Sequence, residues 1–504
     1  MIKRLISLWC TALVAFSLVS CNPFEKDDDE EEEIEKKTSD WLILSYLDAD
    51  NNLNDSLYDD LVNEQRGLAK IAETEGAPSV RILALWDGEA EEEVRTDRNT
   101  RIHPNGALYE LGAMDETTYQ NLNSGMAKGF VVSANTSDLT SSVSWLKTEP
   151  DMSDVDTLKA FLSWANKYYS ATNVVLLLSD HGAGTEYETY SGGIKGYYND
   201  SRTASRSLCS DETNGGGVLT ALDVKNAISA SGLSVNVIWQ DCCLQGNAET
   251  AYGLAGSADY LVTSANLSYS NDHYSVISSL ADSSSTPLSF AKAVVKAYAE
   301  YHENTVMEET KYRASFDTVL TQAVYNLSRT KQTALYSAIG SLASALIADS
   351  AASNVYANYV AQDGSSLANC KGMAYGGSYV YLNDIGYFSQ NLASDSTVTA
   401  NTRTAAQNVI TALGNIIECS WLGKQSASDS SPYYVRNLDG YTGQHDSEGI
   451  YGLTIATQIK PDCCKSDGTE YSGFPLYSYY SELTGYSDKW GELLKVWYAD
   501  KRYQ

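Results

Sequence analysis

The 504-residue sequence is poor in basic residues, and this shortage argues against one class of partner. It holds 35 Lys and Arg against 65 Asp and Glu, a formal net charge of −30 at pH 7. Such a chain repels phosphates, so we expect no nucleic acid partner. Histidine is also scarce. The five His have no zinc-ligand spacing, and the vicinal cysteine pairs are not C-x-x-C motifs, so we predict no metal site.

Long apolar runs are missing as well, except at the N-terminus. Lys3 and Arg4 precede "LISLWCTALVAFSLV", which is too short for a membrane span and is typical of an export signal. We assign residues 1–20 to this signal. The following "LVSC" resembles the lipobox of bacterial lipoproteins, which predicts lipidation of Cys21. A plain cleaved signal with a chance cysteine is the alternative.

An acidic block follows the signal. Residues 21–38 contain "NPFEKDDDEEEEIEKK", which cannot collapse and is expected to be an extended tether. It resembles the surface-export signal of Bacteroidetes lipoproteins, with a mere spacer as the competing interpretation. The resemblance implies a protein lipid-anchored to the outer membrane of a Gram-negative bacterium, at the cell surface.

Residues 39–284 alternate apolar runs with helical patterns, which predicts an α/β domain with a mainly parallel sheet. The predicted strands are 41–47, 80–86, 173–179, 235–240 and 259–265, and the predicted helices are 55–74, 154–170, 221–231 and 246–258. Long polar segments interrupt this pattern at about 88–140 and at 184–217. For residues 285–504 we predict a helical and mixed region packed on the first domain.

Two predicted strands end in residues that carry chemistry. His181 and Gly182 follow "NVVLLLS", and Cys242 and Cys243 follow "VNVIWQD". Alone, the histidine could be an ordinary loop residue and the thiols core filler. Together, at the same edge of one sheet, they favour a nucleophile and its base. Without Cys10 and Cys21 seven cysteines remain, and an odd number in an exported protein leaves at least one thiol unpaired unless two chains cross-link.

Four blocks in order resemble the clostripain-like cysteine peptidases, relatives of caspases, legumain and gingipains. They are "WLILSYLDADNNLNDSLYDDL", "MSDVDTLKAFLSWANKYYSATNVVLLLSDHGAG", "VIWQDCCLQGNAETAY" and "YGLTIATQI". The resemblance implies a caspase-like α/β/α sandwich. It also implies a catalytic pair of Cys243 and His181, with Cys242 as a bystander. The backbone N–H groups of Gly182 and Cys243 would hold the oxyanion.

The resemblance further implies cleavage after Arg or Lys, with the acids Asp241 and Asp272 in the specificity pocket. At the second acid the family has G-D-G-W, whereas this chain has "NDHY", and Asp241 could instead cap a helix. Relatives often cut themselves between the His and Cys blocks, where candidate sites here are Lys195, Arg202 and Arg206. No cofactor is needed for the chemistry, and a calcium requirement is left open.

Protein or peptide substrates and a monomeric chain complete the expectation. Three other functions stay open: a surface-binding lipoprotein that lost activity, a peptide ligase or acyl transferase using the same Cys–His pair, and a glycan-binding lipoprotein. The altered "NDHY" loop favours the surface-binding lipoprotein. The glycan-binding alternative leaves the His and Cys at the two strand ends unexplained.

Overall fold

The structure is a computed structural model that describes most of the chain beyond the N-terminus. The described residues are 34–88, 106–123, 131–182, 208–209, 211, 214, 218–266, 268–304, 320–351, 355, 372–373, 380–423, 434–439, 451–459 and 489–499. The chain divides into two compact units, Met1–Glu35 and Lys36–Gln504, and all elements named below belong to the second. The expected export signal and Cys21 lie outside the described residues.

A ten-stranded sheet forms the centre of this unit, in the order β12-β11-β8-β7-β6-β5-β1-β2-β3-β4. Its middle strands are parallel: β2 (Val80–Gly88), β1 (Lys37–Ala49), β5 (Tyr169–Ser179), β6 (Val237–Asp241) and β7 (Tyr260–Thr263). The outer strands run antiparallel to their neighbours: β3 (Ala107–Glu110), β4 (Ser137–Asp138), β8 (Thr321–Asn326), β11 (Ile417–Leu422) and β12 (Tyr434–Arg436).

Side chains of the central strands are buried on both faces of the sheet. Along β1, Leu42 and Leu44 join one apolar cluster, while Trp41 and Ile43 join the other. Neighbouring positions of a strand point to opposite faces, so a strand covered on both sides must be apolar at nearly every residue. This is why the strands read as continuous apolar runs in the sequence.

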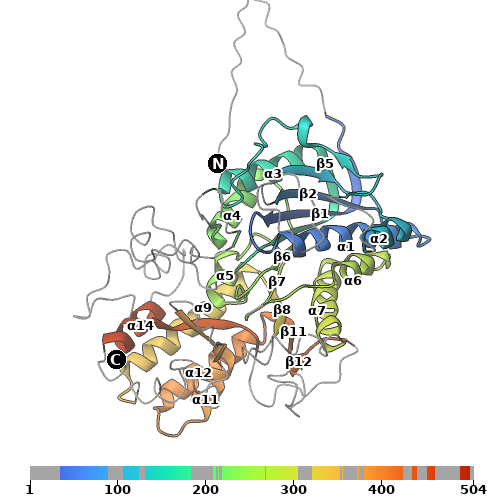
Figure 1. The fold of residues 1–504 in the computed structure, drawn as a ribbon. Coiled ribbons are helices and arrows are strands. Elements are labelled where there is room, and N and C mark those ends of the chain that lie inside the picture. The colour runs from blue at the N-terminus through green and yellow to red at the C-terminus, as the bar shows by residue number, and fades with distance from the viewer. Residues whose placement is uncertain are drawn as a thin grey trace, which may run out of the picture. The chain divides into compact units, whose positions relative to one another are not determined.

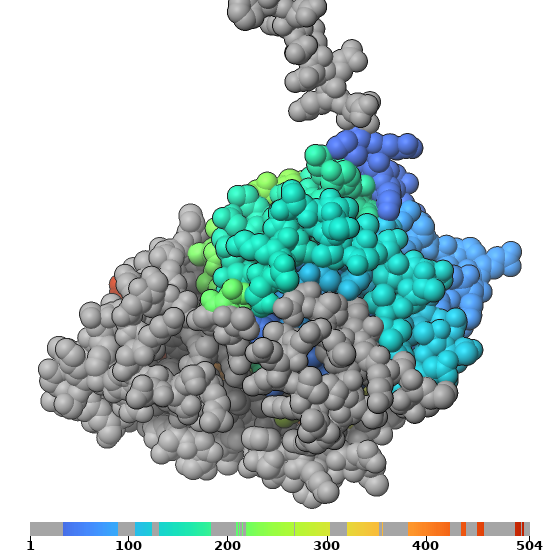
Figure 2. Space-filling view, turned by 45° about the horizontal axis from the view of Figure 1, so that its top comes forward, coloured from blue at the N-terminus to red at the C-terminus, as the bar shows by residue number. Residues whose placement is uncertain are grey.

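Helices supply the two covering layers (Figure 1). One cluster includes side chains of α3 (Val155–Tyr168), α4 (Ala221–Ser231), α5 (Ala248–Gly253) and α9 (Arg329–Ala348). The other includes side chains of α1 (Asn54–Ala72), α2 (Glu116–Asn123), α6 (His273–Ser278) and α7 (Pro287–Asn304). In Figure 2 the teal segment 131–182 forms a continuous surface beside the green α4. The predicted α/β/α sandwich with a mainly parallel sheet is confirmed.

The second half of the chain contributes to this sheet and adds a smaller one. Strands β8, β11 and β12 extend the large sheet beyond β7, so the sheet takes strands from both sides of the expected boundary at residues 284 and 285. That division, 39–284 and 285–504, stays a prediction. The small sheet has the order β13 (Thr454–Ile459), β10 (Val380–Asp384) and β9 (Gly372–Met373).

The remaining helices pack together around α9. These are α11 (Ile385–Ser394), α12 (Ala400–Leu413) and α14 (Lys489–Ala499); α12 and α14 contact α9, and α11 contacts α12. Within the described part of the chain, no helix has both the length and the apolar character needed to cross a membrane.

Candidate active site

The two strand ends singled out in the sequence lie side by side. β5 and β6 are parallel neighbours, and their register pairs Ser179 with Asp241. His181 and Cys243 each come two residues after this pair, at the same edge of the sheet. The expected juxtaposition of the two blocks is therefore confirmed, because parallel strands in register deliver their following residues to one place.

Gly182 lies directly against the backbone of Cys243. A Cβ atom built on Gly182 would lie 2.0 Å from the carbonyl oxygen of Cys243 and 2.9 Å from its backbone nitrogen. No side chain larger than hydrogen fits at such a distance, so a glycine is required here. The chain that follows β5 thus touches the turn that follows β6.

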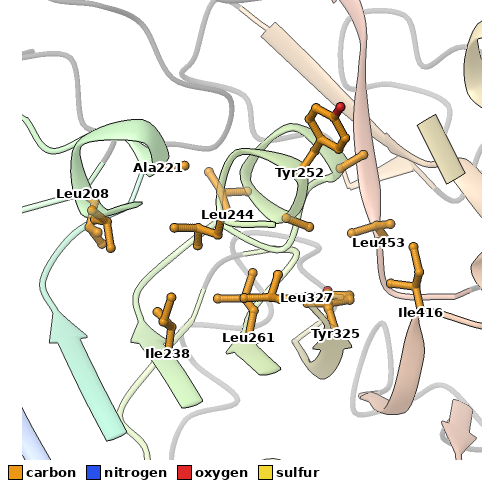
Figure 3. Packing of buried hydrophobic residues seen from close by; sticks show 14 of the residues in the cluster. Leu208, Ala221, Ile238, Leu244, Tyr252, Leu261, Tyr325, Leu327, Ile416 and Leu453 are labelled. Atoms are coloured by element: carbon orange, nitrogen blue, oxygen red, sulfur yellow. The ribbon is translucent and has the colours of Figure 1, made fainter. Parts of the chain in front are cut away.

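The turn after β6 carries Cys243 and is anchored by the next residue, Leu244. Leu244 adopts a left-handed backbone conformation, with φ of 63°. Its side chain lies in the apolar cluster with Ile238 and Leu261 (Figure 3). Its backbone N–H donates to the carbonyl oxygen of Asn266 at 2.9 Å. A non-glycine residue in this conformation costs roughly 1–3 kcal/mol. The burial of the Leu244 side chain and its backbone hydrogen bond offset this cost, and they fix the position of the preceding residue, Cys243.

The turn that follows β6 forms hydrogen bonds with the C-terminal part of the chain. The carbonyl oxygen of Gly246 accepts hydrogen bonds from the backbone N–H and from the hydroxyl of Thr454, at 3.0 and 3.2 Å. The backbone N–H of Ala456 donates to Glu249 at 3.2 Å. The block "YGLTIATQI" therefore supports the turn that carries Cys243, a contact that the sequence alone did not reveal.

Only one of the two vicinal thiols is accessible. Cys242 is 2% exposed, and burial, followed by the nearby Cys243 and Asp241, raises its pKa well above the usual value. Cys243 is half-buried. The thiolate is the reactive form of cysteine, and burial of Cys242 keeps it protonated and inert. None of the four cysteines in the described residues, these two with Cys209 and Cys419, forms a disulfide.

A backbone amide points at the sulfur of Cys243. The N–H of Ser268, in the loop after β7, donates to Sγ at 3.3 Å, and the protonated thiol can donate to the Ser268 carbonyl oxygen at 3.5 Å. A hydrogen bond donated to sulfur favours its charged form. The same loop therefore contacts the nucleophile candidate directly.

His181 is fixed by the turn that follows β1. Its Nε2 lies 3.0 Å from Oδ1 of Asn52. The neighbouring Asn51 donates to Oδ1 of Asp180 at 2.8 Å. In the sequence, Asp48, Asp50 and Asn51 of this turn suggest turn and helix-capping chemistry, and three oxygens on a short turn do not define a calcium site. The feature that places this turn beside His181 is the pairing of β1 with β5. The two strands pair up to Leu47 and Ser179, and both end at the same edge of the sheet.

Acidic side chains gather below this edge. Asp48 is fully buried, and neither oxygen of its carboxyl group has a hydrogen-bond partner among the described residues. Burial, followed by the charges of Asp180 and Asp211, raises the pKa of Asp48 well above its usual value. Burial also raises the pKa of Asp87 to about 9, which favours its protonated form at neutral pH.

The turn of Asp48 to Asn51 does not bring three carboxyl ligands together for calcium, which takes six to eight oxygens. Among the described residues, the one group of three such ligand atoms within 4.8 Å of one another is Asp60, Asp241 and His273. Its histidine nitrogen is a poor calcium ligand. A calcium requirement stays open, and no step of the chemistry is assigned to it.

A sequence model described as the clostripain family matches residues 45–497. The chain belongs to the clostripain family. It is 26% identical over 293 residues to clostripain of Hathewaya histolytica. That match covers 52% of this chain and 49% of clostripain, so the chain spans about half the length of this relative.

Solved structures of other family proteins share the fold. One is an inactive zymogen of a C11 protease from Parabacteroides distasonis, with a TM-score of 0.53 and 14% identity over 90% of this chain and 99% of that one. Another is a secreted C11 cysteine protease from Bacteroides thetaiotaomicron in complex with an irreversible peptide inhibitor. It has a TM-score of 0.53 and 16% identity, over 89% of this chain and 99% of that one.

The two acids expected to bind a substrate cation both have partners inside the protein. Oδ2 of Asp241 lies 3.0 Å from Nε2 of His273. Asp272 caps α6, accepting from the backbone N–H of Ser275 at 3.0 Å and from its hydroxyl at 2.6 Å. Asp241 does not cap the following helix, whose N-cap is Asn247, and its carboxyl group instead faces His273.

The expected processing sites lie outside the described residues. Lys195, Arg202 and Arg206 fall in the undescribed segment 183–207. Its two ends are described, however, and Gly182 pairs with Leu208 as an antiparallel bridge. Leu208 also accepts a hydrogen bond from the N–H of Leu219 at 2.7 Å.

Proposed function

We propose that this protein is a cysteine endopeptidase in which Cys243 is the nucleophile and His181 the general base. The observation that carries the proposal is the contact between the His181–Gly182 block and the backbone of Cys243, at the ends of two neighbouring parallel strands. This contact brings a partly exposed thiol and an imidazole to one edge of a rigid sheet, as nucleophilic catalysis requires.

The chemistry of these residues is the following. His181 takes the proton of the Cys243 thiol, and the thiolate attacks the carbonyl carbon of the scissile peptide bond. The backbone N–H groups of Gly182 and Cys243 stabilise the oxyanion. The imidazolium then protonates the leaving amine, and water hydrolyses the acyl-enzyme. No cofactor takes part.

Asn52 acts on this pair through His181. With Oδ1 of Asn52 accepting from Nε2–H at 3.0 Å, the proton of a neutral imidazole resides on Nε2. Nδ1 is then the acceptor for the thiol proton, so Asn52 is a positioning residue that sets the tautomer.

Peptides are the proposed substrates, and the inhibitor bound to the Bacteroides thetaiotaomicron relative, a peptide, supports this class. For the residue before the cut we keep the expected preference for Arg or Lys. Asp241 lies two positions before the nucleophile, and a cation entering a pocket lined by a carboxylate gains a charge-assisted hydrogen bond.

We further propose that the active enzyme cuts itself between Gly182 and Leu208, foremost at Lys195. The bridge between Gly182 and Leu208, and the bond from Leu219 to Leu208, support a cut that leaves both new ends attached to the fold. The wild-type protein is expected to give two fragments on a denaturing gel and one species in gel filtration. A Lys195→Ala variant should stay uncut or be cut at Arg202 or Arg206.

The control for this prediction is the Cys243→Ala protein, which should remain a single chain. Adding a small amount of active wild-type enzyme to it tests whether one molecule can cut another. An active wild-type enzyme that stays one uncut chain would contradict self-processing.

The signal and acidic tether support a proposal about location: a monomer anchored through lipidated Cys21 to the outer membrane, with the enzyme at the cell surface. Protease added to intact cells should digest it, and a Cys21→Ser variant should be released from the membrane fraction. A wild-type protein found in the soluble fraction would contradict the anchor.

A further inference from the structure

His273 is a histidine enclosed by carboxylates next to the nucleophile strand. Its side chain is fully buried, with Nε2 3.0 Å from Asp241 and 3.8 Å from Asp60, and Nδ1 3.4 Å from Glu64. Glu64 is also fully buried and accepts from the hydroxyl of Ser45. The ring of Trp239 packs on the imidazole, with centroids 4.6 Å apart. The imidazole is therefore held in one place by contacts on every side.

The surroundings of this imidazole favour its charged form. Burial alone would lower the pKa of His273, but the charge of Asp60 and the hydrogen bonds to Asp241 and Glu64 hold it well above the usual value. Burial raises the pKa of Asp60 to about 8, and the neighbouring His273 opposes this rise. Three carboxyl groups therefore surround this imidazole, and that of Asp241 lies nearest to it.

This arrangement changes what a substrate finds at Asp241. In a pocket with a bare buried carboxylate, a neutral substrate side chain leaves the charge unpaired, and that penalty enforces selection for a cation. Here Asp241, whose side chain is 7% exposed, already has an imidazole partner at 3.0 Å, and the surroundings of that imidazole favour its charged form. A neutral side chain thus leaves no charge unpaired, while a cation must share Asp241 with His273.

We propose that His273 is a specificity-determining residue, an internal counter-ion of Asp241 that reduces the enzyme's demand for Arg or Lys before the cut and admits uncharged side chains of similar shape. The inference rests on the proposed function and refines its substrate class. The sequence is consistent with it, because His273 stands where the similar family motif has a glycine, which offers no counter-ion.

The test compares two fluorogenic peptides that differ only in charge at the residue before the cut, one with arginine and one with its uncharged analogue citrulline. For the wild type at pH 7, the ratio of kcat/KM for arginine over citrulline is expected to be below about tenfold. In His273→Gln, an amide N–H can still reach Asp241 but the positive charge is gone. The ratio should rise at least tenfold, since the charge of Asp241 then falls to the substrate.

Two further variants keep the test decisive. Glu64→Gln removes one of the carboxylates that keep His273 charged, and it should move the ratio in the same direction, which decides the matter if His273→Gln does not fold. His302→Gln is the matched control. His302 is 1% exposed but contacts the carbonyl oxygen of Ser270 at 3.2 Å rather than Asp241, so its loss should leave the ratio unchanged.

The outcomes separate this inference from the proposed function. A wild type that cleaves neither peptide contradicts the proposed peptidase activity, and the inference falls with it. An active wild type with an arginine-to-citrulline ratio above about 1,000, unchanged in folded His273→Gln or Glu64→Gln, overturns the role of His273 and leaves the peptidase intact.

Discussion

Replacing Cys243 with alanine is expected to lower peptide hydrolysis by at least about 10⁴-fold, because removing the nucleophile of a covalent mechanism removes the pathway itself. The change deletes one sulfur atom from a half-buried side chain, so the fold should persist. Release of a fluorophore from a basic peptide measures the rate, and a thermal unfolding curve that matches the wild type shows that the variant is folded.

Cys242→Ala is the matched control, since it removes the same atom from the adjacent residue. Cys242 is 2% exposed, and burial keeps its thiol protonated. This variant should lose some stability, because a buried atom is removed, but retain most of its hydrolysis. If Cys242→Ala were inactive while folded and Cys243→Ala were active, the assignment of the nucleophile would be wrong.

The second large effect concerns His181. His181→Ala should lower kcat/KM by roughly 10²–10⁴-fold, the usual contribution of general acid–base catalysis. The loss should be smaller at high pH, where hydroxide deprotonates the thiol without a base. A pH–rate profile of both proteins measures this. Near-normal turnover by His181→Ala at pH 7 would leave the mechanism without its proton carrier.

Replacing Asn52 is expected to lower the activity less than replacing His181 does. Asn52→Ala removes one hydrogen bond to Nε2 of His181, so a loss of about tenfold is expected rather than thousands. Because Asn52 positions the base, the loss should appear in kcat more than in KM, with a shift of the acid limb of the pH profile. A change in stability alone, with a normal profile, would make Asn52 structural.

The strands of the site could be predicted because burial on two faces leaves a simple mark in the sequence. The runs 41–47, 173–179 and 235–240 lie within or overlap β1, β5 and β6. The helices preceding β5 and β6 were also predictable, since Asp154 caps α3 and Thr220 and Asp223 form a capping box on α4. Adjacent parallel strands then account for the meeting of His181 and Cys243.

The parts of the fold and the site that could not be predicted depend on contacts between segments far apart in the chain. Strands β8 and β11 join the sheet antiparallel from beyond residue 320, and nothing local marks them as its continuation. The bonds from Thr454 to Gly246 and from Asn52 to His181 span 208 and 129 residues. Such pairs follow from the fold, whereas a sequence pattern carries only near neighbours.

The pocket acids illustrate the same limit. A motif can place Asp241 and Asp272 by position, but it says nothing about what else approaches them. His273 lies 32 residues after Asp241, and Glu64 comes from another helix, 209 residues from His273. The histidine that contacts Asp241 therefore became visible only in the structure.

The central claim is that Cys243 is the reactive thiol of a Cys–His pair, and mapping a covalent label tests it most directly. Wild-type protein treated with a peptide-based thiol electrophile, then digested and analysed by mass spectrometry, should carry the label on Cys243. His181→Ala should label far more slowly, and prior labelling should abolish hydrolysis in proportion to the label incorporated. A label on Cys242, Cys209 or Cys419, or full hydrolysis by a protein labelled at Cys243, would contradict the claim.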